Sequence, residues 1–445
     1  MSITSLLFDH KKNRQLFVLA VPMILSNITI PLLGLIDTAV IGHLDQAYYL
    51  GGFALGSAVY SLIIWLLGFL RMSTTGLVAQ AYGANDDATQ QRLLAQSGLI
   101  AVILGIATIA LQQPILNLAL GLSDASDAVQ LYTREYFEIR IWSTPFALLN
   151  LVLIGWLLGR KAPKAAMIQL IVANSINIVL DIVFVIGFNW QVKGAALASV
   201  IAEICAFFIA FVIVRKQLLL DKQFSIINFI KLCHFSGMSR LLMFNRDIFI
   251  RSLCLQASLS FMVFHGAGLG DNTVAANAVL LNLVMLISYA LDGIAYYASA
   301  EVGSAFGKRN RTLMQSTVVL AFFWSAIVAI IFSSVFMLFG DTFIGLQTNI
   351  DAVRQTAMQY SFWLVLMPLF AFNCYLFDGV YIGAAQGAVM RNSMVLSTFG
   401  AFFPLWFVLQ SYGNHALWAA LSGFMLIRSV TLGGHYYWRL RHLPL

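Results

Sequence analysis

Charged side chains are scarce in this 445-residue sequence, and this scarcity excludes a soluble globular protein. Asp, Glu, Lys and Arg together make up 10% of the residues, whereas a soluble globular chain carries about 25%. Hydrophobic residues make up 60%, and the mean hydropathy is +0.84. The composition is therefore that of a polytopic membrane protein.

The motifs of soluble enzymes and of metal sites are also missing. GSAFGKR at 303–309 is one spacer short of a P-loop, and HGAGLGD at 265–271 does not fit the dinucleotide fingerprint. The four cysteines show no CxxC spacing, and the seven histidines show no metal-ligand spacing. The DDxxD motif that a membrane-embedded transferase would need does not occur. We therefore expect no enzyme activity, no cofactor and no bound metal.

Long apolar runs are present instead. About twelve of them, each of about 18 to 26 residues, are long enough to cross a hydrocarbon core of roughly 30 Å as an α-helix. The first run follows basic residues without a cleavage pattern, so we expect a retained helix and not a signal peptide. The expected spans are 16–41, 51–79, 93–119, 137–159, 165–188, 194–214, 247–268, 274–300, 314–339, 358–383, 393–412 and 415–437.

The basic residues indicate how the spans are oriented. A net charge of +7 could suggest nucleic acid as a partner, but roughly nineteen Lys and Arg residues fall on the side that holds both termini, against about three opposite. This asymmetry predicts a multi-pass protein of the bacterial inner membrane with both termini in the cytoplasm. The lipid bilayer, and not nucleic acid, is the expected partner.

The chain repeats itself at a shift of about 224 residues. AYGAND at 81–86 falls on AFGKRN at 305–310, and STPFALLNLVLIGWLLG falls on LMPLFAFNCYLFDGVYIG. The second match aligns Pro145, Asn150 and Gly159 with Pro368, Asn373 and Gly383. A duplicated six-helix unit with both copies in the same orientation is expected to have an axis along the membrane normal.

The predicted fold is therefore all-α, with twelve transmembrane helices in two six-helix lobes related by a pseudo-two-fold axis. The N-lobe is expected at 1–214 and the C-lobe at 247–445. An amphipathic cytoplasmic segment at 215–246 is expected to join them. We expect the protein to be a monomer.

Acidic residues inside the spans are the first functional candidates. There are eight within or at the ends of the spans: Asp37, Glu138, Asp181, Glu203, Asp247, Asp292, Glu301 and Asp378. A helix-end charge or a structural ion pair explains four equally well: Asp247, Glu138, Glu203 and Glu301. For Asp247 the expected partner is Arg251, four residues later. The other four remain candidates, with Asp292 and Asp378 as possible secondary acids of the C-lobe.

Polar side chains around Asp37 and Asp181 favour a site in the first half of the chain. Asn177 lies one turn before Asp181 and so projects from the same helix face, and Ser199 lies on a small-residue face that allows close helix approach. The repeat register places Phe261 opposite Asp37 and Leu405 opposite Asp181. A polar cluster is therefore expected in the N-lobe only.

Pro22 and Pro31 both lie within the first span. A proline removes a backbone hydrogen bond from a helix and can bend it. A bendable helix that ends near a titratable acid predicts a switch, although membrane helices often tolerate proline without such a role.

The sequence resembles multidrug and toxic compound extrusion (MATE) transporters of the prokaryotic DNA-damage-inducible (DinF-like) branch. The resemblance covers essentially the full length and is carried by SNITIPLLGLIDTAVIGHLD, FLRMSTTGLVAQAYGA, NLVLIGWLLG, KGAALASVIAE, NRDIFIRS, DGVYIGA and MRNSM. It implies alternating access and the export of amphipathic organic cations in exchange for protons or sodium. It also implies Asp37 as the essential acid, Pro22 as the helix-bending residue, and Asn177, Asp181 and Ser199 as hydrogen-bonding partners.

The coupling ion is the main alternative that the sequence leaves open. Sodium-coupled relatives use an acid on the seventh helix, where this chain offers Gln256. We therefore expect proton coupling, with sodium as the alternative. A lipid-linked saccharide flippase of the same superfamily would need several arginines in its cavity, and only Arg140 and Arg251 look available.

Overall fold

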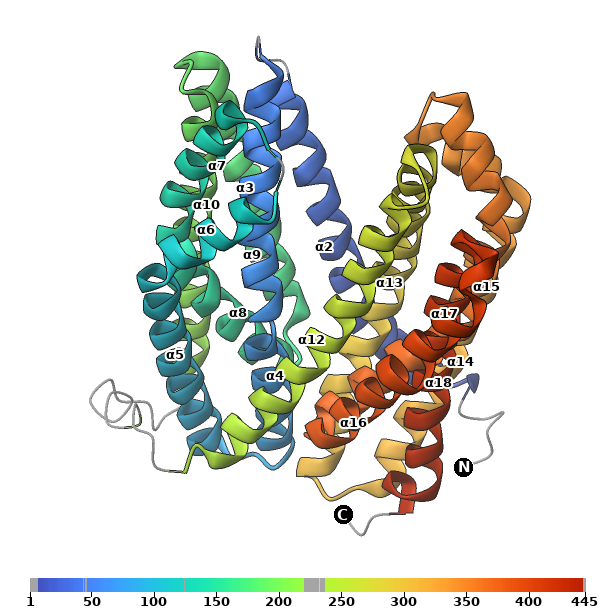
Figure 1. The fold of residues 1–445 in the computed structure, drawn as a ribbon. Coiled ribbons are helices and arrows are strands. Elements are labelled where there is room, and N and C mark those ends of the chain that lie inside the picture. The colour runs from blue at the N-terminus through green and yellow to red at the C-terminus, as the bar shows by residue number, and fades with distance from the viewer. Residues whose placement is uncertain are drawn as a thin grey trace. The chain divides into compact units, whose positions relative to one another are not determined.

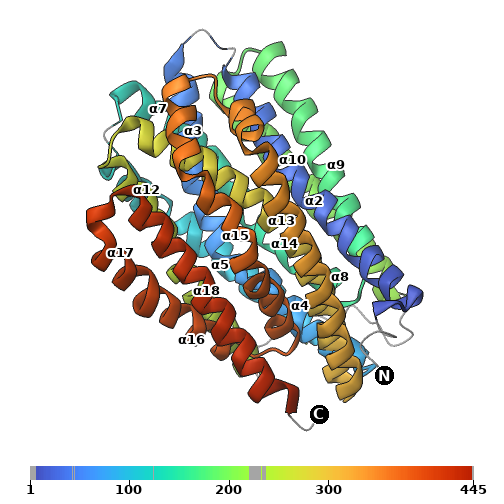
Figure 2. The same ribbon diagram turned by 90° about the vertical axis from the view of Figure 1, so that its right-hand side faces the viewer.

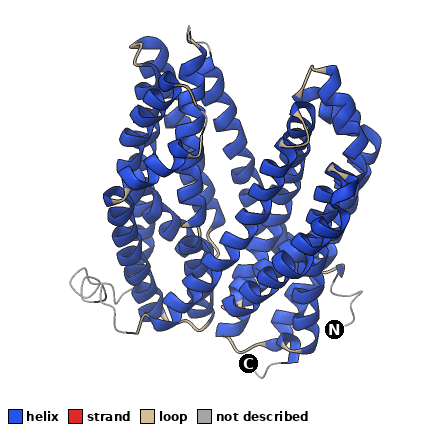
Figure 3. Cartoon of the chain, viewed as in Figure 1, coloured by secondary structure: helices blue, strands red, loops and turns tan. Residues whose placement is uncertain are grey.

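The computed structural model describes residues 7–42, 44, 46–123, 125–219, 232 and 237–442, and its regular structure in these ranges is helical (Figure 3). Twelve helical segments in this part of the chain are long and apolar enough to cross a membrane. The all-α prediction and the number of spans are thereby confirmed. Of the expected amphipathic segment at 215–246, residues 220–231 and 233–236 lie outside the described residues.

The helices group into two compact units, which we call the N-unit (residues 25–241) and the C-unit (residues 1–24 and 242–445). Helix α2 (His10–Gly42) belongs to both, and Figure 1 labels the others. The N-unit contains α3 (Ala47–Leu66), α4 (Phe69–Gly83), α5 (Asp87–Ala110), α6 (Gln112–Gly121), α7 (Asp127–Arg140), η1 (Ile141–Ser143), α8 (Thr144–Gly159), α9 (Pro163–Asp181), η2 (Ile182–Gly187) and α10 (Gln191–Leu219).

The C-unit is built in the same way, and in Figure 2 its helices α16 and α17 lie along α18. Its elements are α12 (Ser239–Ala267), α13 (Asp271–Gly307), α14 (Arg311–Gln347), α15 (Asp351–Gly383), α16 (Gly387–Ser397), η3 (Thr398–Phe402), α17 (Phe403–Leu409), η4 (Gln410–Tyr412), α18 (Asn414–Trp438) and η5 (Leu440–His442).

Helix α2 contributes its first half to the core of the C-unit. Leu16 and Leu19 are buried there with Tyr297 and Tyr381. The expected N-lobe began at residue 1, whereas the described residues 7–24 group with the second half of the chain. This segment therefore packs in the C-unit through its apolar residues, although the sequence repeat assigns it to the N-lobe.

The second half of α2 packs into the N-unit. Ile41 is buried with Val185 and Ala196, and the Asn174 side-chain amide donates to Thr29 Oγ1 at 2.9 Å. Pro22 lies two residues before Ile24, where the helix passes from one unit to the other. The helix is continuous through this point.

The repeat register is confirmed by a helix contact that occurs in both units. A Cβ atom at Gly155 would lie 2.6 Å from the carbonyl oxygen of Arg71, and one at Gly379 would overlap the carbonyl oxygen of Ala295. Gly379 lies 224 positions after Gly155, and Ala295 lies 224 positions after Arg71, so the two contacts are equivalent in the repeat. Glycine is needed at these positions because only a residue without a side chain lets the two backbones approach so closely.

A second contact repeats as well. The Asn150 side chain donates to the carbonyl oxygen of Glu203 at 3.1 Å, and its repeat partner Asn373 donates to the carbonyl oxygen of Ser429 at 3.1 Å. Each bond joins the fourth helix of its repeat to the sixth. The duplication is therefore preserved in polar contacts between helices as well as in sequence.

We predict that Gly379→Ala lowers the stability of the protein by about 1 to 3 kcal/mol, the usual cost of overpacking. The added methyl group meets backbone, which cannot rotate away as a side chain can. The apparent melting temperature in detergent measures the effect. Gly340→Ala is the matched control, because a Cβ there meets nothing within 4 Å and alanine favours the helix. Equal melting temperatures for Gly379→Ala and the wild type would contradict the close contact.

Candidate functional site

Two aspartates, Asp37 and Asp181, lie side by side in the N-unit. Asp37 is near the end of α2 and Asp181 is the last residue of α9. Their carboxyl groups hydrogen-bond each other, which requires one of the two to carry a proton, because an ionised carboxylate can only accept. Asp181 is 1% exposed. Within the described part of the chain, Oδ1 of each acid is buried without a hydrogen-bond partner.

Asn177 and Ser199 complete this cluster, as the sequence predicts. In the amide orientation that satisfies its neighbours, Asn177 donates to Asp181 Oδ2 at 3.2 Å and accepts from Ser199 Oγ at 3.2 Å. The structure therefore brings together all four residues expected in the N-lobe.

The backbone after Asp181 explains how α9 and α10 reach this arrangement. The helix widens into the π-helical segment η2, a distortion common at functional sites. The chain then turns back through Asn189 and Gln191, which both have positive φ. A Cβ atom at Gly194 would lie 3.0 Å from the backbone of Phe184, so glycine lets α10 pack tightly and places Ser199 opposite Asn177.

An ion pair that the sequence analysis missed lies beside the cluster. Arg140 Nη2 is 2.6 Å from Glu203 Oε1, and the guanidinium carbon lies 4.1 Å from the centre of the Tyr60 ring. The charge of Arg140 also acts on Asp37 and Asp181. Glu203 lies one turn after Ser199 on α10. That i to i+4 spacing, together with the need of a membrane-buried arginine for an acid, is the signal that could have found it.

A second buried charge cluster lies in the C-unit. Arg251 on α12 and Arg428 on α18 both donate to Asp378 Oδ2 from α15. All three side chains are buried. Asp292 on α13 is half-buried, and its charge acts on Arg428. Asp378, which the sequence suggested as a possible secondary acid of the C-lobe, is therefore the acid of an ion-pair network.

The expected partner of Asp247 was wrong. Arg251 pairs with Asp378, and Asp247 instead forms ion pairs with Arg391 at 2.6 Å and Arg246 at 3.1 Å. The i+4 spacing allows a contact within one helix, but Arg251 faces the buried side of the unit, where a cation without a counter-charge would cost more free energy.

Glu301 and Glu138 are bonded to amides. Glu301 accepts a hydrogen bond from Gln15 at 2.5 Å, and the exposed Glu138 accepts one from Gln113 at 3.2 Å. These contacts favour the structural interpretation for both acids.

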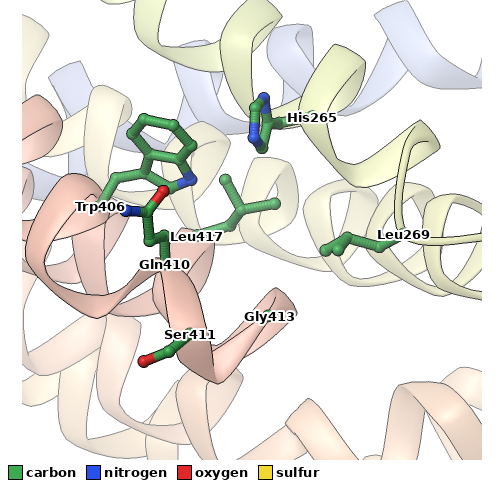
Figure 4. Close-up of a pocket in the computed structure, with 7 residues that line it drawn as sticks. All are labelled: His265, Leu269, Trp406, Gln410, Ser411, Gly413 and Leu417. Carbon is green, nitrogen blue, oxygen red and sulfur yellow. The ribbon is translucent and has the colours of Figure 1, made fainter.

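A cavity of about 240 Å³ lies in the C-unit, between α12, α17, η4 and α18 (Figure 4). The rings of His265 and Trp406 face it, with centroids 4.5 Å apart. Its lining consists of His265, Leu269, Trp406, Gln410, Ser411, Gly413 and Leu417. None of the predicted site residues is among them, so the acidic cluster of the N-unit remains the candidate functional site.

The fold and the buried acids describe a polytopic membrane transporter, and the comparisons identify its family. A model of the MatE family matches residues 22–183 and 248–408. The DNA damage-inducible protein F of Escherichia coli (strain K12) is 44% identical over 434 residues, which cover 97% of this chain and 94% of that protein. The chain therefore belongs to the MATE family of multidrug and toxic compound exporters.

Solved structures confirm the fold. The crystal structure of a MATE in the bent conformation is 21% identical and superposes with a TM-score of 0.81, covering 99% of this chain and 97% of that chain. A MATE crystal structure in the straight conformation is also 21% identical, with a TM-score of 0.80 and coverage of 99% and 97%. At 21% sequence identity, these superpositions establish the fold and nothing about function.

We predict that Asp378→Asn destabilises the protein by about 3 to 5 kcal/mol, because it leaves two buried guanidinium groups without their counter-charge. The yield of monodisperse protein and the apparent melting temperature measure this loss. Asp341→Asn is the matched control, because Asp341 pairs with Arg354 at an exposed position and such pairs contribute little. Equal losses in the two variants would contradict the role assigned to Asp378.

Proposed function

We propose that this protein exports amphipathic and cationic organic compounds across the bacterial inner membrane in exchange for protons. The observation that carries the proposal is the Asp37–Asp181 pair, in which a half-buried and a buried carboxyl group share a hydrogen bond. We further propose that both termini are cytoplasmic and that the protein acts as a monomer. Its membrane partner is the lipid bilayer.

The proposed exchange follows from the charge of the pair. When the shared proton leaves, two anionic carboxylates remain in a poorly hydrated place, and a cationic substrate can compensate them. When a proton returns, the pair loses one charge and its attraction for the substrate falls. Asn177 and Ser199 hold Asp181 in position through both states. One charge moved through 100 mV is worth about 2.3 kcal/mol, which helps to export a neutral substrate. Exchange of one proton for one monovalent cation moves no net charge, so the pH gradient alone drives the export of such a cation.

The C-unit supports proton coupling over sodium coupling. Its buried acid Asp378 already contacts two guanidinium groups, from Arg251 and Arg428. A sodium ion at this carboxylate would have to compete with both of these cations at close range. On α12 the side chain of Gln256 donates to Ser260 at 3.0 Å, and an amide supplies no charge for a cation.

The same ion pairs disfavour the flippase alternative. A lipid-linked saccharide carries phosphate groups, which require cations that are not already compensated. Arg140 is paired with Glu203, and Arg251 is paired with Asp378. Neither of the two arginines that the flippase interpretation needs is therefore available for a phosphate without breaking a buried ion pair.

Helix α2 is the proposed link between proton binding and movement. It carries Asp37 in the N-unit, begins in the C-unit and contains Pro22 near the residue where it passes between them. Two related folds are titled as bent and straight conformations. We propose that protonation of the pair changes the hydrogen bonds of Asp37 and favours a bent α2, which leaves less room for substrate beside the pair and expels it outward.

The proposal is tested in proteoliposomes that contain the full chain and are loaded with ethidium as the transported cation. We predict ethidium transport under an imposed pH gradient without sodium, and none in Asp37→Asn, although this variant should still bind ethidium measurably. Glu138→Gln is the control, because Glu138 is an exposed acid of the same unit. Transport that depends on a sodium gradient at constant pH would replace the proton with sodium, and full transport in Asp37→Asn would remove Asp37 from the mechanism.

A second prediction concerns Pro22. Pro22→Ala restores a backbone hydrogen-bond donor where α2 passes between the units, so transport should fall although Asp37 is intact. Pro31→Ala is the matched control within the same helix and should have a smaller effect, because Pro31 lies wholly within the N-unit. Structures at low and high pH should differ chiefly in α2. Normal transport by Pro22→Ala, with one shape of α2 at both pH values, would favour direct competition between proton and substrate at Asp37.

A further inference from the structure

The N-unit cluster contains three acids and one guanidinium group, and these four groups are not equivalent. Glu203 has a partner on each oxygen: Arg140 binds Oε1 at 2.6 Å, and the Tyr60 hydroxyl donates to Oε2 at 3.2 Å. Asp37 and Asp181 each keep a buried Oδ1 without a partner among the described residues. The guanidinium group is therefore committed to one of the three acids.

The surroundings of Arg140 strengthen this commitment. Its guanidinium also donates to Ser143 Oγ, and Ser143 lies 3.0 Å from the Tyr60 hydroxyl. The titratable groups whose charge or dipole acts on it come from several helices of the unit. They are Tyr60 from α3, Tyr136 from α7, Glu203 from α10, Asp37 from α2 and Asp181 from α9. The tyrosines are neutral at physiological pH, so the charge balance depends on the three acids alone.

Glu203 is bound by the Arg140 guanidinium at Oε1 and by the Tyr60 hydroxyl at Oε2. The two aspartates instead bond each other, which requires a shared proton. In this arrangement the Arg140 guanidinium compensates the charge of Glu203. One shared proton compensates one of the two aspartates.

We propose that Arg140 is a positioning residue of the coupling site, which keeps Glu203 in the ion pair and leaves the Asp37–Asp181 pair to exchange a single proton per transport cycle. The ion pair also fixes α10, on which Ser199 lies one turn before Glu203 and faces Asn177. The inference rests on the proposed function, because it assigns the roles of groups around the same pair.

The test removes the counter-charge of Arg140. In Glu203→Gln the guanidinium group has the aspartate pair as its nearest remaining acids, and an additional cation favours their ionised form. The pair then takes up its proton only at lower pH. We expect the pH midpoint of ethidium binding, measured by fluorescence on the purified full chain, to move to lower pH by about one unit or more.

Two variants separate this effect from a merely structural one. Glu135→Gln breaks the ion pair between Glu135 and Lys193, which joins the same helices α7 and α10 at 3.3 Å, and it should leave the midpoint unchanged. The double variant Arg140→Gln with Glu203→Gln removes both charges and should return the midpoint toward the wild-type value. A purely structural ion pair would lower the melting temperature of the variants without moving the midpoint.

Proton release gives a second measurement that needs no variant of the ion pair. In weakly buffered solution the wild type should release no more than one proton for each ethidium bound, and Asp37→Asn should release none. Release of two protons by the wild type, or an unchanged midpoint in Glu203→Gln, overturns the inference. Equal release by Asp37→Asn and the wild type overturns the proposed function itself, so the two failures are distinguishable.

Discussion

The cost of placing a charge in a poorly hydrated interior is the constraint on which the rest of this structure depends. An ionised side chain in such a place is stable only when an opposite charge or several hydrogen bonds compensate it. The chain meets this requirement with Arg140 at Glu203 and with Arg251 and Arg428 at Asp378. In the proposed function, the Asp37–Asp181 pair meets it with a shared proton, a compensating partner that can leave.

This difference separates the two units although they share a common plan. The glycine contacts at Gly155 and Gly379 and the asparagine bonds at Asn150 and Asn373 repeat at the same helix positions. The ionisable groups do not repeat, because Phe261 and Leu405 stand where the N-unit has Asp37 and Asp181. The duplicated scaffold therefore carries the candidate site in one unit and the ion-pair network of Asp378 in the other.

Helix α2 carries the site residue Asp37 and also contributes to the core of each unit. Its first turns are buried with Tyr297 and Tyr381 in the C-unit, and its last turns contain Asp37 and are buried with Val185 in the N-unit. A change in hydrogen bonding at Asp37 acts on a helix that is anchored at both ends. Pro22, near the boundary, lacks the donor that would stiffen it.

The sequence by itself determined the twelve spans, because helix length and hydrophobicity are local properties of the chain, and comparison of the chain with itself revealed the repeat. It also indicated Asp37, Asn177, Asp181 and Ser199 as candidate site residues. Only the tertiary structure decided which charges meet. Arg251 has Asp247 within one turn, yet it pairs with Asp378, 127 positions away, and Arg140 pairs with Glu203, 63 positions away. Pairing of buried charges depends on which helix faces adjoin, and sequence spacing does not carry that information across different helices.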